Sequence, residues 1–297
     1  MKKLVHLLIM SSLLLGACKQ DDPSANPTPP PASSNQGPKL YFTFKFDSTQ
    51  QRLNNLGQPS VLPPGHAAQS PRFRKMSAHY IELCPQMLTA LGAGSILYHA
   101  PETMAGGETA IDFDKSTVVG EGETFFSIPL SQMNAGTYEF LRISLAYQNY
   151  DIDFKYDSLH LQGSVASFIG YNTYIKSFRP KDIPVTVNSN KKQGYWAFET
   201  VGQILQGQAP PGATTVPNPI FASSPVPQGS CVVTGQFQSP LTITGNETSD
   251  IHIQVSLSIN NSFEWKDYLS PDGIYEPSAG DSVVDMGIRG LIPFVFR

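Results

Sequence analysis

Apolar and polar residues alternate along much of this chain, and that pattern limits the folds open to it. In residues 250–260, aliphatic side chains take every second position, while His252 and other polar residues take the positions between them. Successive residues of a strand face opposite sides of a sheet, so this segment is predicted to be a half-buried strand. Weaker alternation marks residues 40–46, 125–130, 141–147, 152–156, 159–168, 185–188, 195–199, 231–237, 241–244 and 282–286.

Turns rich in glycine, proline and asparagine separate these segments, which favours strands joined as neighbours over alternating strands and helices. The expected fold class is all-β: an antiparallel β-sandwich in one domain, with two packed sandwiches as the alternative. Few or no helices are expected, and the best candidates, residues 85–91 and 201–206, are only a turn or two long. The long proline-rich stretch 207–229 is predicted to cover a sandwich edge, with part of a binding rim as the alternative.

The N-terminus has the pattern of an export signal. Lys2 and Lys3 precede a short apolar run, residues 4–15, which is too short to span a bilayer. The run ends in Leu15-Gly16-Ala17-Cys18, which resembles a lipobox, the motif cut by lipoprotein signal peptidase after the cysteine thiol receives diacylglycerol. We therefore predict a signal peptide over residues 1–17 and a lipid anchor on Cys18. An ordinary signal peptide with a chance cysteine is the alternative.

Residues 18–38 are predicted to be a disordered, proline-rich tether, which leaves residues 39–297 for the outer domain. By resemblance to known lipoprotein sorting signals, Lys19 after the cysteine argues against retention in an inner membrane. The expected location is the outer membrane, facing the periplasm or the cell surface. The formal net charge of −4 lacks the basic face that nucleic-acid binding requires, so no nucleic-acid partner is expected.

Two further cysteines, Cys84 and Cys231, follow in a chain predicted to enter an oxidising compartment. They are predicted either to form a disulfide or to remain as two buried, unpaired thiols.

Catalytic motifs are missing from the sequence: it has no nucleophile elbow, zinc-protease helix, phosphate loop or dinucleotide fingerprint. The histidines are dispersed and are expected to be solvated, although His99 with Glu102 could chelate a metal. Asp151 and Asp153 would share one strand face, which is expected to meet solvent because Ile152 takes the opposite face.

A calcium site is one hypothesis for the C-terminal region. Asp267, Asp272, Glu276 and Asp281 surround an Asp-Gly turn, and calcium takes six to eight oxygen ligands in irregular geometry. The match to known calcium loops is incomplete, and a strand-connecting loop with Asp272-Gly273 as its turn is the alternative.

Exposed aromatic residues give a second binding hypothesis, because sugars stack on aromatic faces. Tyr195, Trp196 and Trp265 are the candidate ligand-binding residues. Core packing is the alternative for each of them, and a strand over residues 195–199 must bury one of Tyr195 and Trp196.

The C-terminal pattern, residues 262–291, resembles the ending of a group of uncharacterised surface or outer-membrane lipoproteins from Bacteroidota. This resemblance brings no assigned activity and no site residues. The sequence predicts a lipid-anchored envelope protein with a non-catalytic binding or structural role, in glycan capture, adhesion or outer-membrane assembly. The alternative is a secreted-type hydrolase whose acidic residues come from separate strands.

Overall fold

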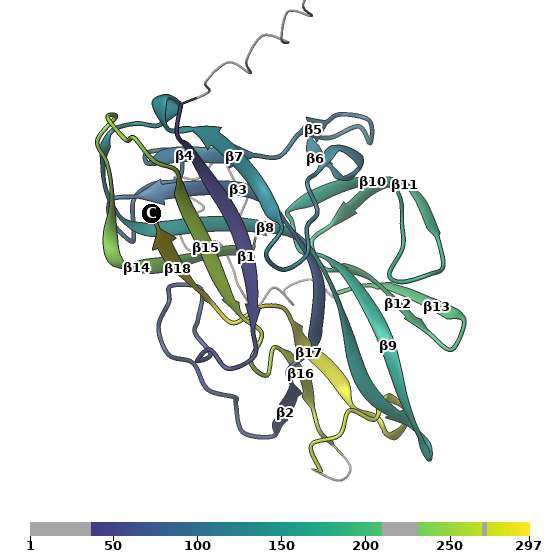
Figure 1. The fold of residues 1–297 in the computed structure, drawn as a ribbon. Coiled ribbons are helices and arrows are strands. Elements are labelled where there is room, and N and C mark those ends of the chain that lie inside the picture. Colours follow the sequence, from purple (N-terminus) through teal and green to yellow (C-terminus); the bar gives the residue numbers. More distant parts are fainter. Residues whose placement is uncertain (1–36, 210–230, 269–271) are drawn as a thin grey trace, which may run out of the picture. The chain divides into compact units, whose positions relative to one another are not determined.

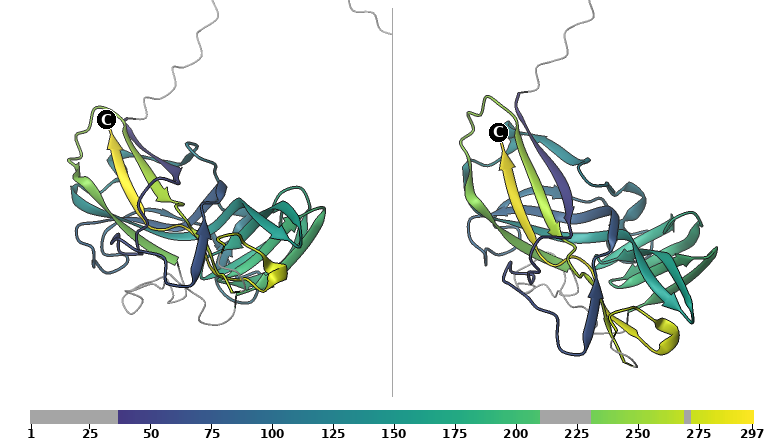
Figure 2. Two further views of the ribbon diagram at one scale, coloured as in Figure 1. Left: turned by 90° about the horizontal axis from the view of Figure 1, so that it is seen from below. Right: turned by 60° about the horizontal axis from the view of Figure 1, so that its bottom comes forward.

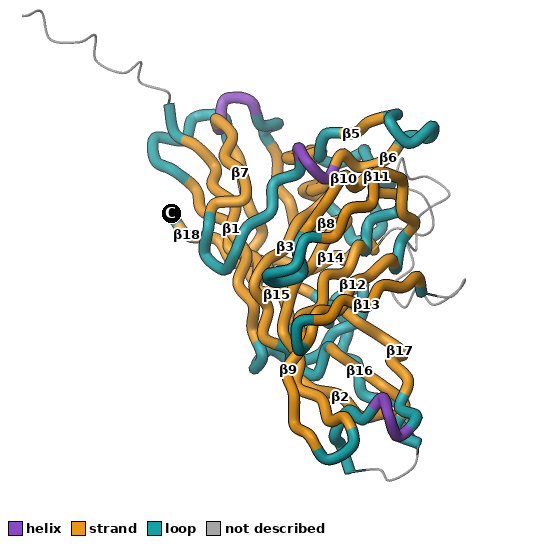
Figure 3. The backbone as a smooth tube through the Cα atoms, turned by 90° about the vertical axis from the view of Figure 1, so that its right-hand side faces the viewer, coloured by secondary structure: helices purple, strands orange, loops and turns teal. Residues whose placement is uncertain are grey.

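The computed structural model describes residues 37–209, 231–268 and 272–297. The predicted signal peptide, Cys18, nearly all of the tether and most of the proline-rich stretch lie outside these residues. The described chain belongs to one compact unit, Gln36–Arg297. It consists of strands and loops apart from three short 3₁₀ turns, Phe113–Lys115, Leu130–Gln132 and Pro277–Ala279, which confirms the all-β prediction (Figure 3).

The first layer is a four-stranded sheet, which we call the β1 sheet (Figure 1). Its order is β18 (Leu291–Phe296), β15 (Ile251–Ser258), β1 (Lys39–Asp47) and β7 (Thr124–Pro129). The predicted alternation holds, since Leu40, Phe42 and Phe44 of β1 are completely buried. Two pairings depart from the antiparallel expectation: β1 runs parallel to β15, with Leu40 paired with Ile251, and in a smaller sheet residues 173–174 run parallel to residues 111–112.

The second layer is a seven-stranded sheet built around β8 (Gly136–Tyr156), and we call it the β8 sheet. One edge of β8 pairs with β3 (Arg72–Cys84), and β3 in turn pairs with β4 (Ser95–His99). The other edge of β8 is shared by two strands. β14 (Cys231–Ile243) pairs with its first half, and β9 (Leu159–Phe168) pairs with its second half, followed outward by β12 (Tyr195–Thr200) and β13 (Gln203–Gln208).

Because β8 is so long, its two halves belong to different cores. The first half packs against the β1 sheet in the largest apolar cluster. The second half, with β9 and β12, is covered on both faces by small sheets (Figure 2). One is the β10 sheet, in the order β11 (Val185–Lys192), β10 (Asn172–Phe178), β6 (Ala110–Asp112) and β5 (Glu102–Thr103); the other is the β16 sheet, in the order β17 (Ser282–Met286), β16 (Phe263–Lys266) and β2 (His66–Gln69).

Neither of the two helix candidates forms a helix. Residues 201–206 lie in the tight hairpin that joins β12 to β13, where Val201 and Gly202 both have positive φ, 46° and 70°. Two consecutive residues with positive φ form a type I′ β-turn, whose twist matches that of the two paired strands. Residues 85–91 form bends and turns. Within the described residues, no helix has the length and apolar character required to cross a membrane.

Candidate functional site

A cavity of about 740 Å³ lies against the β8 sheet, beside β17. Its wall on the β8 sheet follows from strand alternation in β9 and β12. Tyr195 and Ala197 face the β10 sheet, so Trp196 and Phe198 face the cavity. On β9, Val165 and Ser167 face it in the same way, and residues 282–288 form much of the opposite wall. The size falls within the range of small-molecule sites, and most of the lining is apolar.

On this wall, Trp196 has a small residue as its partner on each neighbouring strand. It pairs with Ser167 of β9 on one side and with Gly207 of β13 on the other. A Cβ atom placed on Gly207 would lie 2.4 Å from Cζ2 of the Trp196 indole, so the ring lies over the bare glycine backbone. The small neighbours therefore leave a broad aromatic surface facing the cavity, and Trp196 remains partly exposed.

The other two aromatic candidates lie in the core. Tyr195 is 5% exposed and donates its hydroxyl hydrogen bond to Gln206 Oε1 at 2.5 Å. Trp265 is completely buried in the cluster that joins the β8 and β16 sheets. The prediction that a strand here must bury one of Tyr195 and Trp196 agrees with this arrangement. Their burial favours the alternative, core packing, for both Tyr195 and Trp265.

Two carboxylates, Asp281 and Asp285, line the cavity, and protein groups bind both. Asp281 accepts backbone hydrogen bonds from Tyr268 N at 3.3 Å and Glu276 N at 2.8 Å. Asp285 forms an ion pair with Arg289, with Oδ2 2.5 Å from Nη1. Carboxylates held in this way are positioned by the fold and are poor candidates for an acid and base pair. The cavity is thus mostly apolar, and both of its carboxylates already have protein partners.

The predicted calcium ligands do not converge on a common centre. Asp267 accepts a hydrogen bond from Gly273 N at 3.1 Å, and Asp272 accepts one from Ile274 N at 2.9 Å. Glu276 is paired with Lys155 at 2.5 Å, and Asp281 binds the two backbone groups described above. Among the residues that the structure describes, these four carboxylates do not form a metal-binding group. The geometry corresponds to the alternative, a connecting loop with its turn at Asp272-Gly273.

The cysteines remain free, and both are buried. Cys84 of β3 is paired with Phe140, and Cys231 of β14 is paired with Leu145, on opposite edges of β8. Adjacent strands lie about 4.8 Å apart, so the intervening strand alone separates the two Cα atoms by roughly 10 Å. A disulfide requires less than about 7 Å. Of the two alternatives, the structure contains the unpaired thiols.

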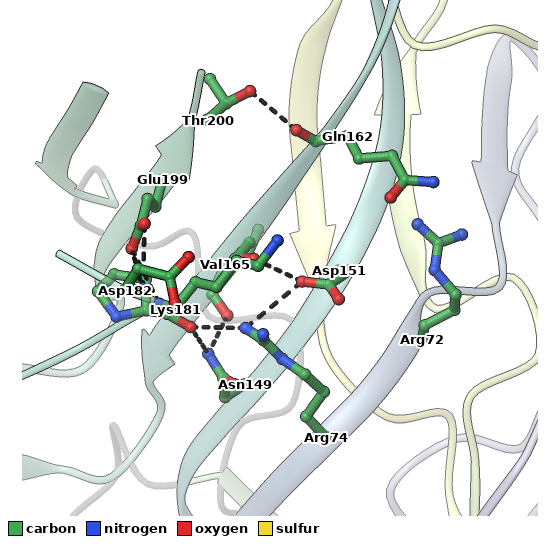
Figure 4. Close-up of polar contacts among 12 residues, drawn as sticks. Arg72, Arg74, Asn149, Asp151, Gln162, Val165, Lys181, Asp182, Glu199 and Thr200 are labelled. Atoms are coloured by element: carbon green, nitrogen blue, oxygen red, sulfur yellow. Dashed lines mark hydrogen bonds and ion pairs between the residues drawn. The ribbon is translucent and has the colours of Figure 1, made fainter. Parts of the chain in front are cut away.

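The carboxylates near the second half of β8 serve the fold (Figure 4). Asp151 is 3.4 Å from Arg74 and accepts a hydrogen bond from Ser164, while the exposed Asp153 forms an ion pair with Arg72. Glu199 accepts hydrogen bonds from the backbone N–H groups of residues 181–183, at 2.9 to 3.1 Å. These contacts fix the loop between β10 and β11. Asp153 is largely exposed as expected, whereas Asp151 is partly buried.

A third residue joins the predicted pair of His99 and Glu102. Within the described residues, one group of at least three side chains could hold a metal ion, and it consists of His79, His99 and Glu102. His79 Nε2 lies 2.9 Å from Glu102 Oε1, and His99 Nε2 lies 3.9 Å from the same oxygen. Burial lowers the pKa of His79 to about 4, against the opposing effect of its hydrogen bond to Glu102. Its ring is therefore neutral at neutral pH. The spacing of His99 and Glu102 indicated chelation, but nothing in the sequence connects His79 to them.

Comparison of the chain with family models, curated proteins and solved structures gives no match.

Proposed function

We propose that this chain is a lipid-anchored, non-catalytic binding protein of the cell envelope, and that its cavity binds an elongated apolar ligand such as an acyl chain. The cavity lined by Trp196 is the observation that carries the proposal. Its apolar lining favours a hydrocarbon over a glycan, since a glycan requires several polar groups to replace its lost hydration. The two carboxylates in the lining already have protein partners, which weighs against the hydrolase alternative.

The lipobox at residues 15–18 supports the envelope location. Diacylglycerol on Cys18, followed by a polar and proline-rich segment, would hold the folded domain at a distance from the bilayer. The lysine after that cysteine supports the outer membrane as the location, with the domain facing the periplasm or the outside. A glycan or an outer-membrane protein remains a candidate partner only through other surfaces of the domain.

Binding of a fluorescent fatty acid, parinaric acid, to the purified protein in detergent tests the cavity. Leu205 lines it and is 57% exposed, so Leu205→Glu introduces a charge at the cavity without disturbing the core. Leu159 is similarly exposed, at 60%, but lies outside the lining, so Leu159→Glu is the matched control. We expect Leu205→Glu to weaken binding at least about tenfold, equivalent to ~1.4 kcal/mol, and Leu159→Glu to change it little. Equal affinity of the two variants would remove the support for a cavity ligand.

Location is tested separately with Cys18→Ser. We expect this variant to lose incorporation of radiolabelled palmitate and to leave the membrane fraction, because the anchoring thiol is absent. Unchanged labelling and fractionation would contradict the anchor without affecting the cavity measurement.

A further inference from the structure

We propose that His79, His99 and Glu102 form a binding site for a divalent transition-metal ion, with Zn²⁺ as the best match, in a place separate from the cavity. None of these residues lines the cavity. Two imidazoles and one carboxylate are a donor set that Zn²⁺ uses, whereas Ca²⁺ and Mg²⁺ prefer oxygen ligands alone.

The spacing of the donor atoms is close to what a tetrahedral ion requires. One donor atom from each residue lies within 4.8 Å of the other two. Bonds of about 2.0 to 2.1 Å in a tetrahedral site place ligand atoms roughly 3.3 Å apart. The contact between His79 and Glu102 is shorter than this, at 2.9 Å, and that between His99 and Glu102 is longer, at 3.9 Å. His99 has a half-exposed side chain, so a small rotation of its ring can close the longer distance.

A backbone distortion brings His79 into the site. In β3, Ser77 pairs with Tyr147 of β8, Ala78 with Leu145 and Tyr80 with Ser144, so the ladder is irregular here: His79 has no partner on β8, and the residue between Leu145 and Tyr147 has none on β3. Irregularities of this kind, as in β-bulges, redirect a side chain and are common beside functional sites. The His79 carbonyl also accepts a hydrogen bond from Ala100 N at 2.7 Å, which holds the end of β4 beside this irregularity.

Hydrogen bonds outside the donor set prepare His99 and Glu102 for a cation. His99 Nδ1 lies 2.9 Å from the carbonyl oxygen of Ala100. A carbonyl only accepts, so Nδ1 carries the proton and Nε2 offers its lone pair to the site. The hydroxyl of Tyr171 donates to Glu102 Oε1 at 3.0 Å and orients that carboxylate. Such partners of the ligands are a regular part of metal sites.

His79 Nδ1 is buried and has no hydrogen-bond partner in the described residues. No acceptor therefore fixes the tautomer of this ring, and its proton can move from Nε2 to Nδ1 when a cation replaces the hydrogen bond to Glu102.

The side chains of Glu102 and His99 are 31% and 49% exposed, so an ion can enter from solvent. Three protein ligands leave a fourth position for water or a further ligand.

A bound ion would also connect two sheets. His79 and His99 belong to the β8 sheet, whereas Glu102 begins β5 of the β10 sheet. An ion that binds the folded chain more tightly than the unfolded chain must raise its thermal stability. Binding of the metal ion can therefore be measured as a rise in the melting temperature of the protein, as well as directly.

The experiment uses the purified full protein in detergent, without a histidine tag and after treatment with a chelator. Zn²⁺ is titrated against a chromophoric competitor, and Co²⁺ is added in parallel to record the visible bands of a four-coordinate site. The informative variants are His99→Ala and Glu102→Gln, because both positions are partly exposed and tolerate change better than the buried His79. His160→Ala is the matched control, since His160 is exposed and lies outside the cluster.

We expect one Zn²⁺ per chain, a higher melting temperature with Zn²⁺, and affinity at least ~100-fold weaker in His99→Ala and Glu102→Gln. His160→Ala should bind as the parent does. Absence of stoichiometric binding, parent-like affinity in both cluster variants, or equal loss in His160→Ala would each overturn the proposal.

Discussion

The indole of Trp196 lies across the backbone of Gly207, its partner on the neighbouring strand, so closely that a Cβ atom on the glycine would be 2.4 Å from Cζ2 of the ring. The indole therefore takes the space that a side chain at position 207 would need. The strand opposite Trp196 thus determines how this side chain faces the cavity.

Replacement of Gly207 by alanine should turn the indole away. Because the contact is with the far end of a side chain, the ring can move, and we expect the melting temperature to change little. We expect affinity for parinaric acid to fall severalfold, because the aromatic wall of the cavity is disturbed. Gly37→Ala is the control, since its added methyl group meets nothing within 4 Å. Unchanged affinity in Gly207→Ala would show that the orientation of Trp196 does not matter for binding.

A buried ion pair joins β3 to β8. Glu82 and Arg142 are paired residues whose side chains are 0% and 1% exposed, and their charged atoms lie 3.3 Å apart. Arg142→Met leaves the carboxylate without its cation in the core, so we expect the free energy of unfolding to fall by about 3 to 5 kcal/mol. The measurement is urea denaturation. Arg72→Met, which breaks the exposed pair with Asp153, should cost less than about 1 kcal/mol. Similar losses in both variants would contradict this ranking.

Protonation of His79 should destabilise the fold in mild acid. Burial lowers its pKa to about 4, from 6.5, so between these values the unfolded chain binds a proton that the folded chain does not. The free energy of unfolding must therefore fall as the pH drops from about 6.5 to about 4, with a slope of at most ~1.4 kcal/mol per pH unit from this group. His79→Gln should flatten that slope and His160→Gln should not, measured by denaturation with a chelator present. An equal slope in parent and His79→Gln would assign the pH dependence to other groups.

Strands with unbroken alternation were predictable from the sequence, and distorted strands were not. β15 and β1 keep one face apolar from end to end, as the sequence indicates. In β3, Met76 and Ala78 face the main core, but after the irregularity in the ladder Ile81 and Leu83 do so. The positions that face the core shift by one residue, which breaks the two-residue alternation of the sequence, and no strand was predicted there.

Contacts between residues far apart in the chain could not be predicted from the sequence either. β8 appeared as two candidate segments because its halves bury different faces against different sheets. The cluster of His79, His99 and Glu102 depends on the irregularity in β3 and on the place where the chain passes from β4 to β5. Strand pairing of this kind is set by tertiary packing, so the local pattern indicated that one of Tyr195 and Trp196 is buried, without saying which, and it could not place His79.

Counting the free thiols per chain tests both the state of the two buried cysteines and the modification of Cys18. Burial raises the pKa of both Cys84 and Cys231 to about 12, so neither is a reactive thiolate near neutral pH. Cys231 lines the cavity, so its protection rests on its raised pKa, and we expect both residues to react with Ellman's reagent far more slowly in the folded protein than after denaturation. After denaturation without reductant, both should react, because β8 lies between them and prevents a disulfide.

The proposed thioether at Cys18 cannot react with this reagent, so the denatured membrane form should give two thiols per chain. Cys84→Ala should give one, because it removes only its own sulfur and leaves Cys231 unpaired. If Cys84 and Cys231 were bridged, the parent would give none and only reductant would release two thiols. A count of three would instead mean that Cys18 carries a free thiol, which would contradict the lipid anchor while leaving the buried pair as described.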